Sequence, residues 1–187
     1  LTTTSGTTLT ASTSLTLTGD LTNSGSFTSN SATTTFIKSG TQSILGTGDT
    51  TFSHLEINSG STLVAPTSLS ITGDYTNNGT FTAGSGTTTF SGSSLQTATG
   101  TMNGTSAFNN VQITNTSGTD ADSAPSIIFG AAASSSGTLT ITDPGVMVQF
   151  EAGATTTWQD ISLAGDEGDF VYLRSTVSGT QWNILVP

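Results

Sequence analysis

The chain contains no cysteine and only two basic residues in a length of 187. Without cysteine it can form no disulfide, no zinc–thiolate site and no thiol nucleophile. With only Lys38 and Arg174 to neutralise phosphates, we expect neither nucleic acid nor an anionic membrane as a partner. No apolar run approaches the roughly 18 residues that cross a bilayer, so membrane insertion is not expected either. The sequence begins at Leu1 without a signal peptide, and we expect it to be a processed or excised segment.

Proline and charge are also scarce, with 4 prolines, 7% charged residues and a net charge of −10. Disordered chains are also poor in apolar residues, but they usually carry high charge or abundant proline. Threonine and serine instead dominate, with 42 and 28 residues respectively. The hydrophobic residues make up 32% and are regularly placed, so we expect the chain to fold.

An internal repeat is the strongest feature of the sequence. Residues 13–46 return as residues 67–100 at an offset of 54, without a gap and with 19 of 34 positions identical. The match extends upstream and, after a two-residue insertion, downstream, where TFSHLEIN corresponds to AFNNVQIT. A degenerate third copy follows. We therefore predict a single domain over 1–187 with repeats at about 5–58, 59–114 and 117–187.

Within each copy, apolar and polar residues alternate with a period of two, as in Leu15-Thr-Leu17 and Leu55-Glu-Ile57. This pattern is typical of short strands with one buried face. Thr-Gly-Asp and Asn-Asn-Gly segments separate the strands, and such residues favour turns. No window has helical spacing, and serine, threonine and glycine are poor helix formers.

Short strands in a long repeat indicate a parallel β-solenoid, in which each coil lies on the next at about 4.8 Å. We predict an all-β parallel β-helix of roughly seven to nine coils. An antiparallel β-sandwich remains the alternative. Equivalent residues of the copies are expected to stack inside in five columns: Leu15/Leu69/Leu139, Phe27/Phe81, Phe36/Phe90, Phe52/Phe108/Trp158 and Leu55/Val111/Ile161.

The strings LTLTGDLTNSGSFTSNSATTTF, SITGDYTNNGTFTAGSGTTTF, AFNNVQI and VYLRSTVSGTQWNI resemble the repeats of very large secreted, adhesin-like β-helix proteins of bacteria. The resemblance covers about residues 5 to 184. It implies a right-handed parallel β-helix displayed at the cell surface. It supplies no catalytic residues.

The inventory of catalytic groups is thin, and we do not expect an enzyme. His54 is the only histidine, lies at an outward phase and is replaced by Asn110 in the second copy. Asp20 and Asp74 occupy equivalent Gly-Asp corners, which favours turn capping over acid–base catalysis. No cofactor or metal site is predicted. The weak candidates for calcium are Asp166, Glu167 and Asp169, and a solvated turn is the preferred interpretation.

Outward Thr-x-Thr pairs form the main alternative to a purely structural role. They occur at Thr16/Thr18, Thr33/Thr35, Thr87/Thr89, Thr140/Thr142 and Thr155/Thr157. Flat stacked rows of such pairs would resemble the surface of an ice-binding β-solenoid. Val64 is expected to interrupt the row of Thr8 and Thr10, and threonine is in any case a good strand residue.

We therefore expect a structural subunit or segment of an extracellular, cell-surface fibre or adhesin-like rod. Both ends of the solenoid lack a polar cap, which predicts head-to-tail self-association or a longer chain. The alternative function is a glycan- or ice-binding module that uses the outward threonine rows, and surface glycans are possible partners.

Overall fold

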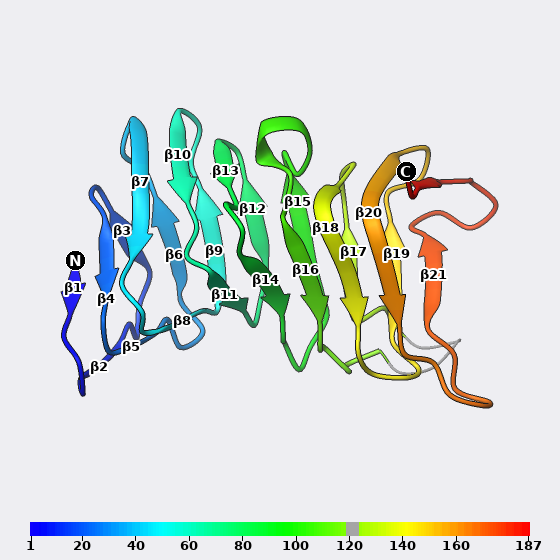
Figure 1. Cartoon of the computed structure of the whole chain (residues 1–187), viewed down its shortest axis with the longest axis horizontal. Helices are drawn as coiled ribbons and strands as arrows, with labels where there is room; N and C mark the ends of the chain where they lie inside the picture. The colour runs from blue at the N-terminus through cyan, green and yellow to red at the C-terminus, as the bar shows by residue number, and fades with distance from the viewer. Residues whose placement is uncertain (119–123) are drawn as a thin grey trace.

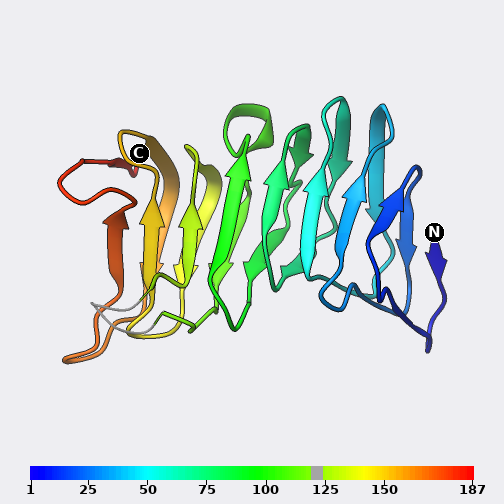
Figure 2. The ribbon, with the colours of Figure 1, turned by 180° about the vertical axis from the view of Figure 1, so that it is seen from behind.

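A computed structural model describes residues 1–118 and 124–187. Within these residues, short strands wind into three parallel sheets, of which two run the length of an elongated molecule and one ends near its middle (Figure 1). The termini lie at opposite ends of the long axis, as the view from behind also shows (Figure 2). All of the strand-to-strand ladders in the described residues are parallel, which confirms the β-solenoid and rules out the antiparallel sandwich.

Each of the first five coils contributes one strand to each sheet. The first sheet contains β1 (Thr2–Thr3), β4 (Leu21–Asn23), β7 (Gly40–Leu45), β10 (Ser61–Val64) and β13 (Thr80–Thr82). The second contains β2 (Thr8–Thr10), β5 (Ser26–Thr28), β8 (Asp49–Phe52), β11 (Ser68–Ile71), β14 (Thr87–Phe90), β16 (Asn110–Ile113), β18 (Ser134–Ile141), β20 (Thr155–Leu163) and β22 (Asn183–Leu185). The third contains β3 (Leu15–Leu17), β6 (Thr33–Phe36), β9 (His54–Ile57), β12 (Tyr75–Asn77), β15 (Gln96–Gly100), β17 (Ile127–Phe129), β19 (Met147–Phe150) and β21 (Tyr172–Ser175).

We call the three sides of the rod the first, second and third faces, after the sheets that form them. The first sheet ends at β13, and other segments continue the first face beyond it. A short 3-10 helix, η1 (Gly104–Ser106), takes the next position, and its Ser106 hydroxyl accepts a hydrogen bond of 3.1 Å from the Phe81 backbone N–H. The flanking residues Met102 and Phe108 form parallel bridges to the beginning of β18. β18 has a register shift between Ser135 and Thr138, so its first half continues the first face and its second half the second face.

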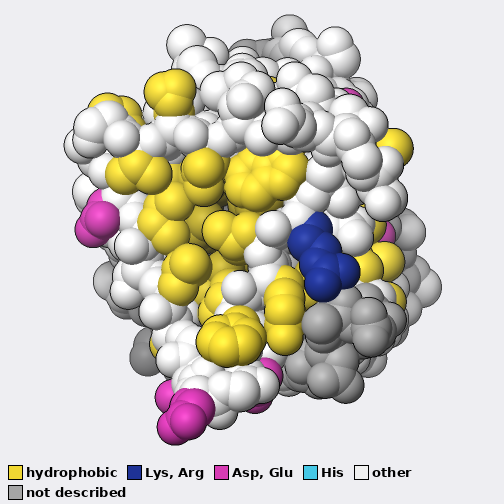
Figure 3. Space-filling view, turned by 90° about the vertical axis from the view of Figure 1, so that its right-hand side faces the viewer, with side chains coloured by type: hydrophobic (Ala, Val, Ile, Leu, Met, Phe, Trp, Pro, Cys, Tyr) yellow, Lys and Arg dark blue, Asp and Glu magenta, His cyan; other side chains and the backbone are white. Residues whose placement is uncertain are grey.

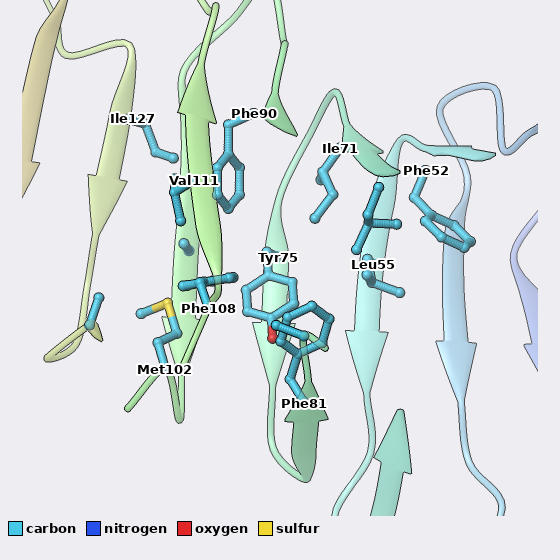
Figure 4. Close-up of a cluster of buried hydrophobic side chains, with 14 of the residues drawn as sticks. Phe52, Leu55, Ile71, Tyr75, Phe81, Phe90, Met102, Phe108, Val111 and Ile127 are labelled. Carbon is cyan, nitrogen blue, oxygen red and sulfur yellow. The ribbon is translucent and has the colours of Figure 1, made fainter. Parts of the chain in front are cut away.

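The core is a column of apolar side chains enclosed by the three sheets (Figure 4). Tyr75 packs against Phe81 and Phe108, with ring centroids 5.8 Å apart in each pair. All the side chains expected inside are buried or partly buried, which confirms the inward phase of every strand from which they come. The period-two alternation therefore identified the buried face correctly.

The predicted stacking of equivalent residues is wrong for most columns. Strands β3–β7 return eight strands later as β11–β15, and eight strands make two and two-thirds coils of three strands. The second copy therefore sits one face away from the first. Phe27 lies in the second sheet but Phe81 in the first, and Phe36 lies in the third sheet but Phe90 in the second.

The true columns combine different repeat positions. Leu15 stacks on Thr34 and Leu17 on Phe36, so Leu15 does not share a column with Leu69. Leu55 likewise stacks on Tyr75 and not above Val111. Two expected pairs, Leu69 with Leu139 and Val111 with Ile161, do share a column. All four lie in the single column that runs from Leu69 through Thr88, Val111 and Leu139 to Ile161. Phe108 and Trp158 are also linked, through Ser135, whereas Phe52 is followed by Ile71.

Candidate interaction surfaces

The second sheet carries a nearly continuous row of outward hydroxyl side chains. Along five successive strands, β2, β5, β8, β11 and β14, the paired residues are Thr10, Thr28, Thr51, Ser70 and Thr89. A second row two residues upstream contains Thr8, Ser26, Asp49, Ser68 and Thr87. We call these ten residues the hydroxyl face. They include no aromatic and no basic side chain, and only one carboxylate.

Val64 does not interrupt this face, contrary to the sequence expectation. It lies in β10 of the first sheet, where it pairs with Ser43 and Thr82. The expectation failed because it assumed that Val64 shares a face with Thr10, its counterpart in the first copy, whereas the two residues lie in different sheets. The five predicted Thr-x-Thr pairs are all exposed or partly exposed, but they lie on different faces. Thr16/Thr18 and Thr33/Thr35 lie at the third sheet, and Thr87/Thr89 and Thr140/Thr142 lie at the second sheet. Thr155/Thr157 lie in the first half of β20.

The C-terminal end of the solenoid exposes apolar side chains. Of the ten large hydrophobic residues that the described chain exposes, six lie between residues 163 and 186: Leu163, Phe170, Val177, Ile184, Leu185 and Val186. Seen end-on, hydrophobic side chains fill the centre of this end (Figure 3). Contiguous exposed apolar surface of this kind marks an interaction site or an aggregation hazard.

A hollow of about 740 Å³ opens at this end. It is lined by Leu173, Arg174 and Trp182 together with the segment from 175 to 181. The Trp182 ring stacks on Phe150, with centroids 4.6 Å apart, and so covers part of the last core layer. The Arg174 guanidinium lies 5.4 Å from the centre of the Tyr172 ring. The hollow is thus lined mostly by polar residues, together with Leu173, Val177, the Trp182 ring and one cation, Arg174.

Repeated polar contacts join successive coils, and they account for Asp20 and Asp74. The Asp20 carboxylate accepts a hydrogen bond of 2.8 Å from the Ser43 backbone N–H, and Asp74 does the same for Thr97. Both carboxylates accept these bonds from the next coil, 23 residues on, whereas the sequence favoured capping of their own turns. The equivalent positions therefore have a structural role in the two copies.

Buried amide side chains complete these fastenings, and sequence reasoning missed them. Gln42 and Gln96 are fully buried. The Gln42 Nε2 group donates to the carbonyls of Leu17 and Gly19. Their signal was present, because both glutamines occupy the same position in the 54-residue repeat.

His54 lies on the outer side of the third sheet with 38% of its side chain exposed. Its Nδ1 atom accepts a hydrogen bond of 3.0 Å from the Asp74 backbone N–H and lies 3.5 Å from an Asp74 carboxylate oxygen. This contact joins one coil to the next, as the Asp20 and Asp74 contacts do. No nucleophilic hydroxyl is hydrogen-bonded to His54 in the described part of the chain.

Asp166, Glu167 and Asp169 form an exposed turn. The backbones of Asp166 and Asp169 exchange two hydrogen bonds, of 2.9 and 3.1 Å, and Gly168 between them has a φ of 85°. Among residues 1–118 and 124–187, no three acidic or histidine side chains are grouped so that they could hold a metal ion. The turn is thus held by its own backbone.

Over the same described residues, no helix has the length and apolar character required to cross a membrane. Comparison of the chain with protein-family models, with curated proteins and with solved structures finds no match in any of the three.

Proposed function

We propose that the protein is a structural unit of an extracellular surface fibre or rod that assembles end to end. The observation that carries this proposal is the open C-terminal end, where most of the exposed large hydrophobic side chains gather (Figure 3). A solenoid that stands alone needs a polar cap over its last coil, because that coil otherwise exposes core side chains and unpaired backbone groups. The extracellular setting rests on the resemblance of the repeats to those of secreted adhesin-like proteins.

Sedimentation at rising concentration, with electron microscopy of the same samples, tests the assembly. The wild-type chain should form polymers that lengthen with concentration. Leu163→Asp should leave monomers, because Leu163 is 44% exposed at the open end and continues the buried column of Ile141. The matched control is Leu45→Asp, since Leu45 is 48% exposed on the side of the rod, in β7. A wild-type chain that stays monomeric at high concentration would refute the proposal.

A second candidate function is binding to the ordered water of an ice surface through the hydroxyl face. The row Thr10–Thr28–Thr51–Ser70–Thr89 favours it, because its members repeat at the strand spacing of about 4.8 Å and form a continuous hydroxyl rank. Glycan binding, the other possibility for these rows, normally uses aromatic stacking, and the hydroxyl face offers no ring.

Thermal hysteresis and inhibition of ice recrystallisation test this second candidate. Thr51→Lys, in the centre of the row, should abolish the activity. Thr76→Lys, which places the same change on the outer side of the third sheet, should leave it intact. Equal activity of the two variants, or none in the wild type, would remove ice binding from consideration.

A further inference from the structure

The two ends of the solenoid differ in shape, because its three faces contain different numbers of layers. Within the described residues the first face has nine layers: β1, β4, β7, β10, β13, η1, the first half of β18, the first half of β20, and β22. The second and third faces have eight each, ending at the second half of β20 and at β21. The chain therefore makes eight three-sided coils and adds one strand, β22, which stands a layer above its neighbours.

We propose that this stepped end binds the first coil of a second copy of the chain, with β22 taking the place of the second copy's β1. This inference rests on the proposed end-to-end assembly and specifies its geometry. In the second copy, β2 continues the second sheet on β20, and β3 continues the third sheet on β21. The first-face position of that coil is already filled by β22, so β1 of the second copy has to give way.

Continuous side-chain columns fix the register of the contact. In the second sheet, Leu9 stacks on Phe27 and Phe27 on Thr50. Thr50 lies in the column of Leu69, because the following residues, Thr51 and Ser70, are paired. The same column runs on through Thr88, Val111 and Leu139 to Ile161. Leu9 of the second copy therefore lies over Ile161, and its Thr10 pairs with Ser162 on the outer side.

The third sheet gives a consistent register. The column of Leu15 contains Thr34, Leu55, Tyr75, Ala98, Phe129, Phe150 and, at the open edge, Ser175. Leu15 of the second copy thus lies over Ser175. Because β21 ends at Ser175, the paired register of the third sheet stops at this residue.

Neither edge carries a charged side chain or a proline that would prevent this contact. Residues 1–19 contain no charged side chain and no proline. Edge strands that avoid pairing usually carry lysine, proline or an inward-pointing charge. At the other edge, the outward residues Asp160 and Arg174 would face Thr8 and Ser14 of the second copy, so neither charge is buried against a like charge. The free backbone N–H and C=O groups of both edges can therefore pair.

β1 is the weaker of the two competing strands. It has only two residues, and its Thr3 hydroxyl bonds the Asn23 side chain. The carbonyls of Leu1 and Thr3 accept backbone hydrogen bonds from Thr22 (2.8 Å) and Ser24 (3.1 Å), and the Leu1 amino group donates to the Asp20 carbonyl. Any strand that presents carbonyls at those positions can accept the same bonds. β22 also brings Ile184, which pairs with the buried Thr156, faces inward and is exposed by 38%. Its burial in the contact favours the exchange.

Disulfide trapping tests the register, and the absence of native cysteine makes it clean. The variant Thr10→Cys with Ser162→Cys places two thiols opposite each other across the contact, at about 4.8 Å, within disulfide reach. The control, Thr8→Cys with Ser162→Cys, displaces one thiol by two residues, to roughly 8 Å between Cα atoms, beyond the limit of about 7 Å. Mild oxidation should give a ladder of covalent oligomers for the first pair only.

The outcomes separate this inference from the proposed function. Polymers that sediment normally but give no ladder for the first pair, or a ladder for the control, overturn the register and leave the assembly standing. Chains that stay monomeric overturn both.

A pair of aspartate variants tests the exchange of β22 for β1. Ile184→Asp should prevent polymerisation, because it puts a charge on the inserted strand. Thr3→Asp should leave polymers intact, because β1 is displaced in the assembled state and the charge then lies in water. Circular dichroism melting of both variants verifies the fold. Polymers from Ile184→Asp together with monomers from Thr3→Asp would show that β1 keeps its place and would overturn the exchange.

Discussion

Replacing Gln96 with leucine is the most informative single change in this solenoid. The Gln96 side chain is fully buried. Its Oε1 atom accepts a hydrogen bond of 2.8 Å from the Gly92 backbone N–H, and its Nε2 group donates to the carbonyls of Ile71 at 2.9 Å and Gly73 at 2.6 Å. The first contact closes its own turn, and the other two hold the previous coil. The Oε1 atom also accepts a hydrogen bond of 3.0 Å from the Asn115 side-chain amide, which bonds the carbonyls of Ser94 and Ser126 as well. Leucine keeps much of the volume but removes all four bonds of Gln96.

The magnitude follows from the groups left behind. A buried donor or acceptor that loses its partner costs about 1–3 kcal/mol. The Gly92 N–H and the Ile71 carbonyl lose theirs, and so does the Gly73 carbonyl, whose bond is only partly buried. Burying an apolar side chain returns up to about 2 kcal/mol. The net loss in the free energy of unfolding should be about 3–5 kcal/mol, a large part of the roughly 5–15 kcal/mol of a typical domain.

Urea unfolding followed by circular dichroism measures the effect. The twin variant Gln42→Leu should lose a similar amount, because Gln42 bonds the Lys38 N–H and the Leu17 and Gly19 carbonyls in the same way. The control Gln112→Leu changes a partly exposed glutamine of β16 and should stay within about 0.5 kcal/mol of wild type. A loss below about 1 kcal/mol for Gln96→Leu would refute the view that these amides fasten the coils.

Three further predictions concern the core, metal binding and alkaline pH. Phe81→Ala should lower the free energy of unfolding by about 3–5 kcal/mol, because Phe81 is fully buried against Tyr75 and Phe108; a loss under about 1 kcal/mol in urea unfolding would place it at the surface. Strong chelation should leave the melting temperature unchanged; a drop that calcium reverses would point to the turn at Asp166 and Asp169. Burial raises the pKa of Tyr75 well above its ordinary value of about 10, against a smaller opposing effect of the Asn77 side chain. As the pH rises, the unfolded chain therefore loses the Tyr75 proton before the folded chain does, so the stability that is present below pH 10 should fall above it. Tyr75→Phe should lose less free energy of unfolding than wild type between pH 9 and 11, and equal losses would contradict this.

The solenoid could be predicted from the sequence, with an antiparallel sandwich left as the alternative, because alternation and repeat length are visible in the residues themselves. Leu15 and Leu17 in β3, or Leu69 and Ile71 in β11, point inward as their spacing predicts. Strands of three or four residues separated by turns cannot bury one face alone, so stacking was the expected solution. Parallel pairing then followed from a repeat much longer than a hairpin.

The faces could not be read from the sequence because turn lengths decide how many strands fit in 54 residues. Ser53 alone separates β8 from β9, whereas Ile37, Lys38 and Ser39 separate β6 from β7. Such differences change the number of strands per repeat without changing the residue count. An expectation of whole coils per copy therefore placed Phe27 under Phe81 and Val64 in the wrong row.

Both copies of the repeat keep the hydrogen bond from one coil to the next, although the bond lies on a different face in each copy. Asp20 reaches Ser43 on the first face, and Asp74 reaches Thr97 on the third, with the same distance of 2.8 Å. The change of face does not disturb these bonds, because both partners belong to one copy and change face together.

The outer surface is different, because each face combines positions that are not equivalent in the repeat. In the hydroxyl face, Ser70 is the counterpart of Thr16, and Thr89 is the counterpart of Thr35, yet both counterparts lie on the third face. Simple repetition would have spread these hydroxyls around the rod, so the unbroken row from Thr10 to Thr89 requires a suitable residue at five unrelated positions. On the third face, Glu56 lies in the row between Thr35 and Thr76. The continuity of the row on one face is therefore a property of that face and not of the repeat, and this distinction makes the hydroxyl face worth testing separately from the stepped end.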